Sequence, residues 1–373
     1  MNRRKFLVAA GGATLAAGAT GAGLYTLSDT GNLVRADLGP GDGGGGPLEA
    51  DERAILSLAA LAPSGHNAQP WSVRRLAPYH WVVGNDPTRW LPAVDPEQRE
   101  TVLSIGAFLQ NLESAAGTLG YSCSWTLLAK TNQDGRVVEV KLTPGGGSVS
   151  FDGDAIRSRR TVRSHYLGDA LADADLAALV AGESEFVHYL PAASKESGAL
   201  NELTVEANRL QSARDPAQQE LADWVRFSSR DAAERRDGLT TAGMEMGGVT
   251  AWAVRNFYGK GSVLTPDFRR RGLDGVAAQV ARSAGWLLVT GRGDSVADLL
   301  DAGRRAERLF LRARPRGVAL HPMTQVLEEP ATRAEFARSP GVAGVQFLLR
   351  VGYVKDYPPP VSLRRPVGWF VVT

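Results

Sequence analysis

An internal echo, a pattern of residues that occurs twice in the sequence, sets the strongest limit on how this chain can fold. Two glycines and a leucine occur twice with identical spacing, first as Gly106, Leu112 and Gly120 and again as Gly303, Leu309 and Gly317. Each set follows an apolar, tryptophan-led stretch, at residues 81–83 and 286–289. Self-similarity at a fixed spacing is the signature of a repeated structural unit. The echo therefore predicts a duplication that places two α+β halves in one chain, with a chance likeness between two long helices as the alternative.

Hydrophobic periodicity and turn residues predict elements on both sides of this echo. In the first half we expect helices at 54–61 and 95–120, a strand at 81–83, and a hairpin of 126–130 with 137–142. In the second half we expect helices at 173–180, 199–213 and 295–314, a helical, charge-rich region at 218–236, and strands at 286–290 and 346–351. Pro63 is expected to end the first helix, because its ring disfavours helical geometry at the residue before it.

The N-terminus has the pattern of an export signal. Arg3 and Arg4 resemble a twin-arginine consensus, and no charged residue lies between Lys5 and Asp29. The uncharged run is rich in Ala, Gly and Thr, which suits a weakly hydrophobic signal better than a membrane span. We therefore expect residues 1–30 to direct export by the twin-arginine machinery to the periplasm or cell envelope. A single uncleaved anchor is the alternative, because the run is just long enough to cross a bilayer.

Composition bounds the remaining possibilities. The net charge of +2 gives no overall attraction to nucleic acid or acidic lipid. The single cysteine, Cys123, rules out an internal disulfide and a cysteine-based zinc site, and five scattered histidines show no metal-ligand spacing. A glycine-rich linker is expected at 31–47, followed by a first half at 48–150 and a second half at 151–373. No metal is predicted.

One ten-residue segment, Ala62 to Trp71, gathers a proline, a hydroxyl, an imidazole, two carboxamides and an indole. It directly follows the apolar helical run at 54–61. Neutral donors and acceptors at a helix end can hold a flat polar ligand. The alternative is a helix-terminating turn in which Trp71 fills the core.

A second segment, residues 157–163, carries four arginines and Thr161. Arginine suits phosphate, because its planar group donates two hydrogen bonds while supplying charge. A solvated face is the alternative. A nucleic-acid patch is disfavoured, because there are no flanking aromatic residues and no basic balance overall.

Both segments resemble motifs of the FMN-dependent nitroreductases. Residues 62–71 match A-P-S-x-x-N-x-Q-P-W, and residues 159–163 match R-R-S-x-R with threonine in place of serine. The closing stretch resembles the family's end segment, with R-x-G-Y at 350–353, prolines at 358–360 and a basic pair at 364–365. The motif order is inverted relative to an ordinary family member. The chain thus resembles the single-chain, internally duplicated (Acg-like) branch.

The resemblance implies a nitroreductase-like α+β fold with antiparallel-dominated sheets flanked by helices. The two fused halves would form an intramolecular pseudo-dimer, and we expect a monomer with one FMN between the halves. A lid-like insertion is expected near 218–260. Gly238 is the nearest candidate for a backbone N–H facing the flavin N5. The implied cofactor-binding residues are Pro63, Ser64, His66, Asn67, Gln69, Arg159, Arg160, Thr161, Arg163, Gly238, Arg364 and Arg365.

The implied function is an FMN-binding oxidoreductase that reduces nitroaromatic or quinone-like acceptors, with NAD(P)H as a candidate electron donor. The alternative is a non-catalytic protein that sequesters FMN beneath the lid. No catalytic residue is assigned, since the flavin itself performs the redox step. The glycines at 291 and 293 follow a predicted strand but lack the third glycine of a dinucleotide fingerprint, which argues against a Rossmann site.

Overall fold

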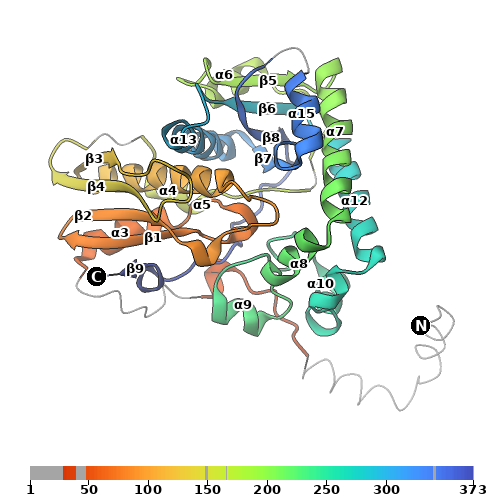
Figure 1. The fold of residues 1–373 in the computed structure, drawn as a ribbon, viewed down its shortest axis with the longest axis horizontal. Coiled ribbons are helices and arrows are strands. Elements are labelled where there is room, and N and C mark those ends of the chain that lie inside the picture. The colour runs from red at the N-terminus through yellow and green to blue at the C-terminus, as the bar shows by residue number, and fades with distance from the viewer. Residues whose placement is uncertain (1–27, 39–47, 148–149, 165, 339–341, 373) are drawn as a thin grey trace.

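The computed structural model describes residues 28–38, 48–147, 150–164, 166–338 and 342–372 (Figure 1). The predicted export signal lies outside the described residues except for its last three positions. Residues 39–47 of the predicted linker also lie outside them. Within the described ranges, no helix is both long and apolar enough to cross a membrane.

The first half is a five-stranded sheet packed against helices. Its elements are α3 (Ala50–Ala59), β1 (Trp71–Ala77), β2 (His80–Asn85), α4 (Arg99–Thr118), β3 (Tyr121–Leu127) and β4 (Arg136–Pro144). The strand order is β3-β4-β2-β1-β9, and the first four strands pair antiparallel. The fifth strand, β9 (Val371–Val372), comes from the C-terminus and pairs parallel with β1.

The second half repeats this connectivity. Its elements are α5 (Gly153–Ser158), α6 (Asp173–Leu179), β5 (Val187–Pro191), β6 (Gly285–Thr290), α13 (Val296–Ala313), β7 (Val318–Pro322), α14 (Gln325–Glu328), α15 (Pro330–Arg338) and β8 (Val345–Tyr353). The sheet order β5-β6-β8-β7 matches β1-β2-β4-β3, and every neighbouring pair is antiparallel. In each half one long helix joins the second and third strands. This confirms the predicted α+β class with antiparallel-dominated sheets in two halves.

The halves differ in the link between their first two strands. A tight turn at residues 78–79 joins β1 to β2, whereas residues 192–284 separate β5 from β6. This insertion holds α7 (Lys195–Ala213), α8 (Asp215–Trp224), α9 (Ser229–Arg235), α10 (Gly248–Phe257), α11 (Lys260–Val263) and α12 (Pro266–Val280). These helices lie along one side of the two sheets, drawn green to cyan in Figure 1. The insertion is wider than the predicted lid at 218–260.

The two long helices, α4 and α13, meet through a reciprocal glycine contact. A Cβ atom on Gly106 would lie 2.2 Å from the carbonyl oxygen of Leu300. A Cβ atom on Gly303 would lie 2.0 Å from the carbonyl oxygen of Leu103. Leu103 and Leu300 hold equivalent positions on the two helices, as Gly106 and Gly303 do, so the two contacts are equivalent. This reciprocity is the pattern of a two-fold symmetric interface.

The other echoed residues also take matching places. Leu112 and Leu309 are both fully buried, in a hydrophobic core that is continuous across the two halves. Gly120 and Gly317 follow the two helices with φ angles of +81° and +65°. Glycine adopts such angles without strain. Gly120 lies just past the end of α4, whereas Gly317 ends the 3₁₀ turn Arg314–Arg316 that extends α13. These shared positions support the predicted duplication.

Several predicted elements shift in the structure. The first strand, β1, was not predicted, because the adjacent Arg74 and Arg75 hide its alternation; Trp71 and Val73 alone point into the core. The hairpin is present, but its first strand occupies Tyr121–Leu127 rather than 126–130. The remaining short elements are the 3₁₀ turns Arg35–Asp37, Gly65–Asn67, Pro87–Arg89, Arg314–Arg316 and Val367–Trp369.

Candidate active site between the two halves

A cavity of about 370 Å³ lies where the two halves meet the insertion. This volume is within the range of small-molecule and cofactor sites. The first half contributes Pro63, Ser64, Gly65, His66, Leu103 and Ala107. The second half contributes Thr161, Arg163, Gly303, Ala306, Phe310 and His321, and the insertion contributes Asn208, Gln211, Gln218, Leu221, Leu239 and Phe268. The two segments singled out in the sequence thus meet at one cavity.

The loop that follows α3 is strained where it reaches the cavity. His66, Asn67 and Gln69 have φ angles of +49°, +55° and +55°. Non-glycine residues adopt this left-handed region at a cost, and such strain concentrates at functional sites. The surrounding contacts must therefore hold the loop in place.

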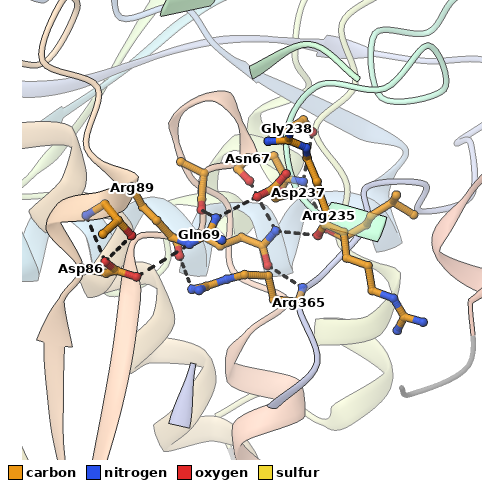
Figure 2. Close-up of polar contacts among 12 residues, drawn as sticks. Asn67, Gln69, Asp86, Arg89, Arg235, Asp237, Gly238 and Arg365 are labelled. Atoms are coloured by element: carbon orange, nitrogen blue, oxygen red, sulfur yellow. Dashed lines mark hydrogen bonds and ion pairs between the residues drawn. The ribbon is translucent and has the colours of Figure 1, made fainter. Parts of the chain in front are cut away.

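Asn67 is one of the two carboxamides that brace this loop (Figure 2). Its Nδ2 donates to the carbonyl oxygens of Gly238 and Leu363, each at 3.2 Å. The N–H of Gly238 donates back to the carbonyl oxygen of Asn67 at 3.2 Å. A guanidinium nitrogen of Arg364 donates to Oδ1 of Asn67 at 3.0 Å. Asn67 therefore joins the loop to the insertion and to the C-terminal tail.

Gln69 is the second brace and is fully buried. Its Nε2 donates to the carbonyl oxygen of Arg236 at 2.9 Å, and its Oε1 accepts from the N–H of Arg365 at 2.9 Å. The Arg365 guanidinium also donates to the carbonyl oxygens of Gln69 at 2.5 Å and Trp71 at 2.8 Å. Figure 2 shows this network closing around the loop from both sides.

Arg159 and Arg364 meet just past the C-terminal end of α3 and do not line the cavity. Both donate to the carbonyl oxygen of Leu61, at 3.2 Å and 2.9 Å. Cationic side chains commonly satisfy the free carbonyls of a helix end. Nε of Arg159 also lies 3.4 Å from a carboxylate oxygen of Glu307. Burial raises the pKa of Glu307 to about 7, against the opposing charge of Arg159.

The arginine segment forms a wall between two cavities. Thr161 and Arg163 line the first cavity, whereas Arg160, Val162 and Ser164 line a second cavity of about 320 Å³. Successive residues of an extended chain point to opposite sides. The arginine segment therefore lines two separate cavities.

Two histidines give the first cavity neutral imidazoles at pH 7. Burial, reinforced by the charge of Arg163, lowers the pKa of His66 to about 4. Burial also lowers the pKa of His321 well below its usual value, with further contributions from Arg163 and Arg350. Both rings then offer one donor and one acceptor.

Some cavity-lining polar atoms have no hydrogen-bond partner in the described part of the chain. They include Nδ1 of His321, Oε1 of Glu100 and Oε1 of Gln325. Buried polar atoms are nearly always paired with protein, water or a ligand. The cavity therefore suits a ligand with polar groups of its own. Burial and the nearby Glu100 raise the pKa of Glu328 well above its usual value, which favours the neutral, protonated form of this carboxyl.

The structure brings together five of the twelve predicted site residues on the cavity wall: Pro63, Ser64, His66, Thr161 and Arg163. The other seven do not line it: Asn67, Gln69, Arg159, Arg160, Gly238, Arg364 and Arg365. The Gly238 N–H, expected to face a flavin, is bonded to Asn67 instead. The cofactor-binding roles of all twelve stay predictions.

Other lining residues, among them His321, Gln325 and those of α7, were not predicted from the sequence. Nothing in their local sequence marks them. Glu100 lies within the helix predicted at 95–120, but no site role was predicted for it.

The fold and the cavity define a two-halved α+β protein with a ligand-sized cavity where the two halves meet. The chain is 26% identical over 314 residues to the Serratia protein named "Probable NAD(P)H nitroreductase PigM", covering 80% of this chain and 86% of that one. It is 27% identical over 327 residues to the Mycobacterium tuberculosis protein named NAD(P)H nitroreductase acg, again a provisional name, covering 84% and 93%. Similarity over most of both lengths makes the chain a relative of proteins named as nitroreductases.

No protein-family model matches the chain. A Bacteroides fragilis nitroreductase with bound FMN is 16% identical, covering 54% of this chain and 87% of that one. Its TM-score is 0.30.

Proposed function

We propose that this protein is an FMN-dependent oxidoreductase of the nitroreductase type, with one FMN in the cavity between its halves. The observation that carries the proposal is the meeting of residues 63–66 with Thr161 and Arg163 on one cavity wall. The names of the full-length relatives support the same activity. Nitroaromatic or quinone-like compounds are the proposed electron acceptors.

The residues of the cavity fit such a cofactor. Ser64 and Thr161 supply hydroxyls, His66 supplies a neutral imidazole, and Arg163 supplies positive charge. The unpaired buried atoms of His321 and Gln325 need polar partners. Bound FMN would supply the redox chemistry by taking up and passing on electrons. The protein would bind it, exclude water and fix its orientation through the strained, braced loop at 64–69.

The first test is flavin binding by the purified full chain. We expect one FMN per chain, seen by absorbance or after titration. Arg163→Ala should weaken binding by roughly 10- to 100-fold, because a hydrogen bond to a charged group contributes about 1.5–3 kcal/mol. Arg230→Ala is the control, since this exposed arginine pairs with Glu234 on the surface. Failure of the folded protein to bind FMN at any concentration would end the proposal.

The alternative is a protein that holds FMN without turning it over. The observation in its favour is the insertion, whose Asn208, Gln211 and Phe268 cover part of the cavity. Anaerobic addition of NADPH, NADH or dithionite separates the two functions. An enzyme's flavin should bleach with a nicotinamide and reoxidise on adding a nitroaromatic or quinone. Bleaching by dithionite alone would favour storage.

We also propose export by the twin-arginine route. The support is the sequence of residues 1–30, which lies almost wholly outside the described residues. Changing Arg3 and Arg4 to lysine should retain the protein in the cytoplasm, as cell fractionation can show. Normal export of that variant would point to another type of signal.

A further inference from the structure

One part of the first cavity is rich in hydrogen-bond acceptors. Glu100, near the start of α4, and Glu328, at the end of α14, both line the cavity, and Gln325 lies one turn before Glu328. Oε1 of Glu100 and Oε1 of Gln325 are buried and have no hydrogen-bond partner among the described residues. The two helices thus present three side chains with acceptor oxygens to the same cavity, and two of these oxygens are unpaired.

The two carboxyls lie close enough to repel each other. The charge of Glu100, together with burial, raises the pKa of Glu328 well above its usual value. The hydrogen-bond donors to Glu328 are neutral: Nε2 of Gln211 donates to one oxygen at 2.6 Å, and the hydroxyl of Thr324 donates to the other at 2.9 Å. These donors offset the repulsion only in part, because neither brings a positive charge.

The arginines that line the cavity do not balance these carboxyls. A guanidinium nitrogen of Arg163 donates to the carbonyl oxygen of Gly243 at 3.0 Å, and Arg269 forms an ion pair with Asp215 at 2.6 Å. Within the described part of the chain, neither of the two cavity carboxyls forms an ion pair. Burying a carboxylate without a counter-ion is unfavourable, so this part of the cavity favours a ligand that brings positive charge.

This group of acceptors lies beside the strained loop at 64–69. A Cβ atom on Gly65 would lie 3.9 Å from Oε2 of Glu100. His321 lines the same cavity, is only 8% exposed and has an unpaired Nδ1. A ligand bound at Glu100 therefore lies next to the loop, in a cavity with a buried imidazole that lacks a polar partner.

Much of the remaining lining is apolar. Leu103, Leu221, Leu239, Phe268 and Phe347 all face the cavity. Apolar walls with a few converging polar groups are typical of sites for small organic molecules. An aromatic body with a cationic group would match both parts of the lining.

We propose that Glu100, Gln325 and Glu328 bind the protonated amine of an aromatic ligand. An ammonium group carries three donors and one positive charge, so it can pair the free oxygens and offset the repulsion between the carboxyls. If the ligand is the electron acceptor, the substrate class is aromatic compounds that carry an alkylamine and a reducible group, and this part of the inference rests on the proposed function. The competing explanation is a polar cluster that water fills and that only holds α14 in place.

The first test measures binding of three probes of similar shape to the full chain as purified. Benzylamine is cationic at pH 7.5, benzyl alcohol is neutral and benzoate is anionic. We expect titration calorimetry to show that benzylamine binds about tenfold or more tightly than benzyl alcohol, with benzoate the weakest. Equal affinities, or no binding of benzylamine at millimolar concentrations, would overturn the proposal.

Variants then locate the preference. Glu100→Gln and Glu328→Gln keep the shape of the side chains, and each should weaken benzylamine by roughly tenfold, because a hydrogen bond to a charged group is stronger than one to a neutral group. Benzyl alcohol should be unaffected. Glu206→Gln is the matched control, since it removes an exposed carboxylate that pairs with Arg209 on α7. A preference for the amine that survives both cavity substitutions would contradict the assignment. Either single variant serves if the double variant does not fold.

A second arm tests the same site in turnover. In an active enzyme, 4-nitrobenzylamine should be reduced with a kcat/KM about tenfold or more above that of 4-nitrobenzyl alcohol, and Glu100→Gln should remove the difference. Equal kcat/KM values would overturn the assignment of the amine to the electron acceptor. If the protein shows no flavin turnover, the proposed function fails, whereas the binding of benzylamine still decides whether the amine site exists.

Discussion

The two halves share one framework and differ in what fills the link between their first two strands. In the first half a tight turn closes the β1–β2 pair, whereas in the second half residues 192–284 open the β5–β6 pair into a helical insertion. The helix contact between Gly106 and Gly303 remains symmetric. The cavity is not symmetric, because the insertion that lines it comes only from the second half and its strained loop comes only from the first. The symmetric contact between the halves thus builds the scaffold, whereas the cavity is formed by features that are present in one half only.

The largest expected effect comes from breaking the symmetric contact. Gly106→Ala and Gly303→Ala each place a Cβ about 2 Å from a backbone carbonyl oxygen, so the two helices must move apart. We expect each to lower the free energy of unfolding by about 3 kcal/mol or more, since overpacking a rigid core costs at least ~1–3 kcal/mol. Urea unfolding measures this.

A control for this pair lies in α7. A Cβ atom added to Gly198 would meet nothing within 4 Å, so Gly198→Ala should be neutral or stabilise by up to ~1 kcal/mol. Markedly unequal losses at positions 106 and 303 would contradict the symmetry of the interface.

An intermediate effect is expected from removing the brace of the asymmetric loop. Arg365→Ala leaves the buried carbonyl oxygens of Gln69 and Trp71 without their donor. We expect a loss of about 2–4 kcal/mol, because each unpaired buried acceptor costs ~1–3 kcal/mol. Hydrogen exchange should become faster at residues 64–69. Arg230→Ala, which breaks an exposed ion pair, should leave stability essentially unchanged. Equal exchange in both variants would show that the tail does not hold the loop.

The smallest effect tests the two helix ends. Gly120→Ala and Gly317→Ala each force a left-handed residue to carry a Cβ, although no clash results at Gly120. The cost should be about 1–2 kcal/mol at each site. Thermal or urea unfolding of the pair gives the comparison. A loss at one site only would mean that the two ends are not equivalent.

The two-halved fold could be predicted, because the glycines that allow the close contact between the two long helices recur with the same spacing in both halves of the sequence. The insertion was harder to delimit, because the short strand β5 was not predicted, so the strand predicted at 286–290 had no partner to mark where the insertion begins. The motifs located the segments of the site but not the direction of each side chain. Arg160 and Arg163 face different cavities because the chain between them is extended.

Glu245 makes a contact that the sequence could not predict. It lies 82 residues from Arg163 along the chain, and only the packing of the insertion brings the two together. The same holds for Asn67 and Gln69. Their motif predicts polar contacts, but the partners, Gly238 and Arg365, come from distant segments.

The C-terminal strand has a consequence for the order in which the molecule is built. β9 completes the sheet of the first half through Val371, and Phe370 packs edge-on against Phe108 of α4. These residues are synthesised about 300 residues after β1. Contacts between such distant segments form slowly, because a long loop must close first. The first half therefore cannot finish folding until residues 370–372 have been made, and the loop at 64–69 cannot be fully braced before Arg364 and Arg365 are present.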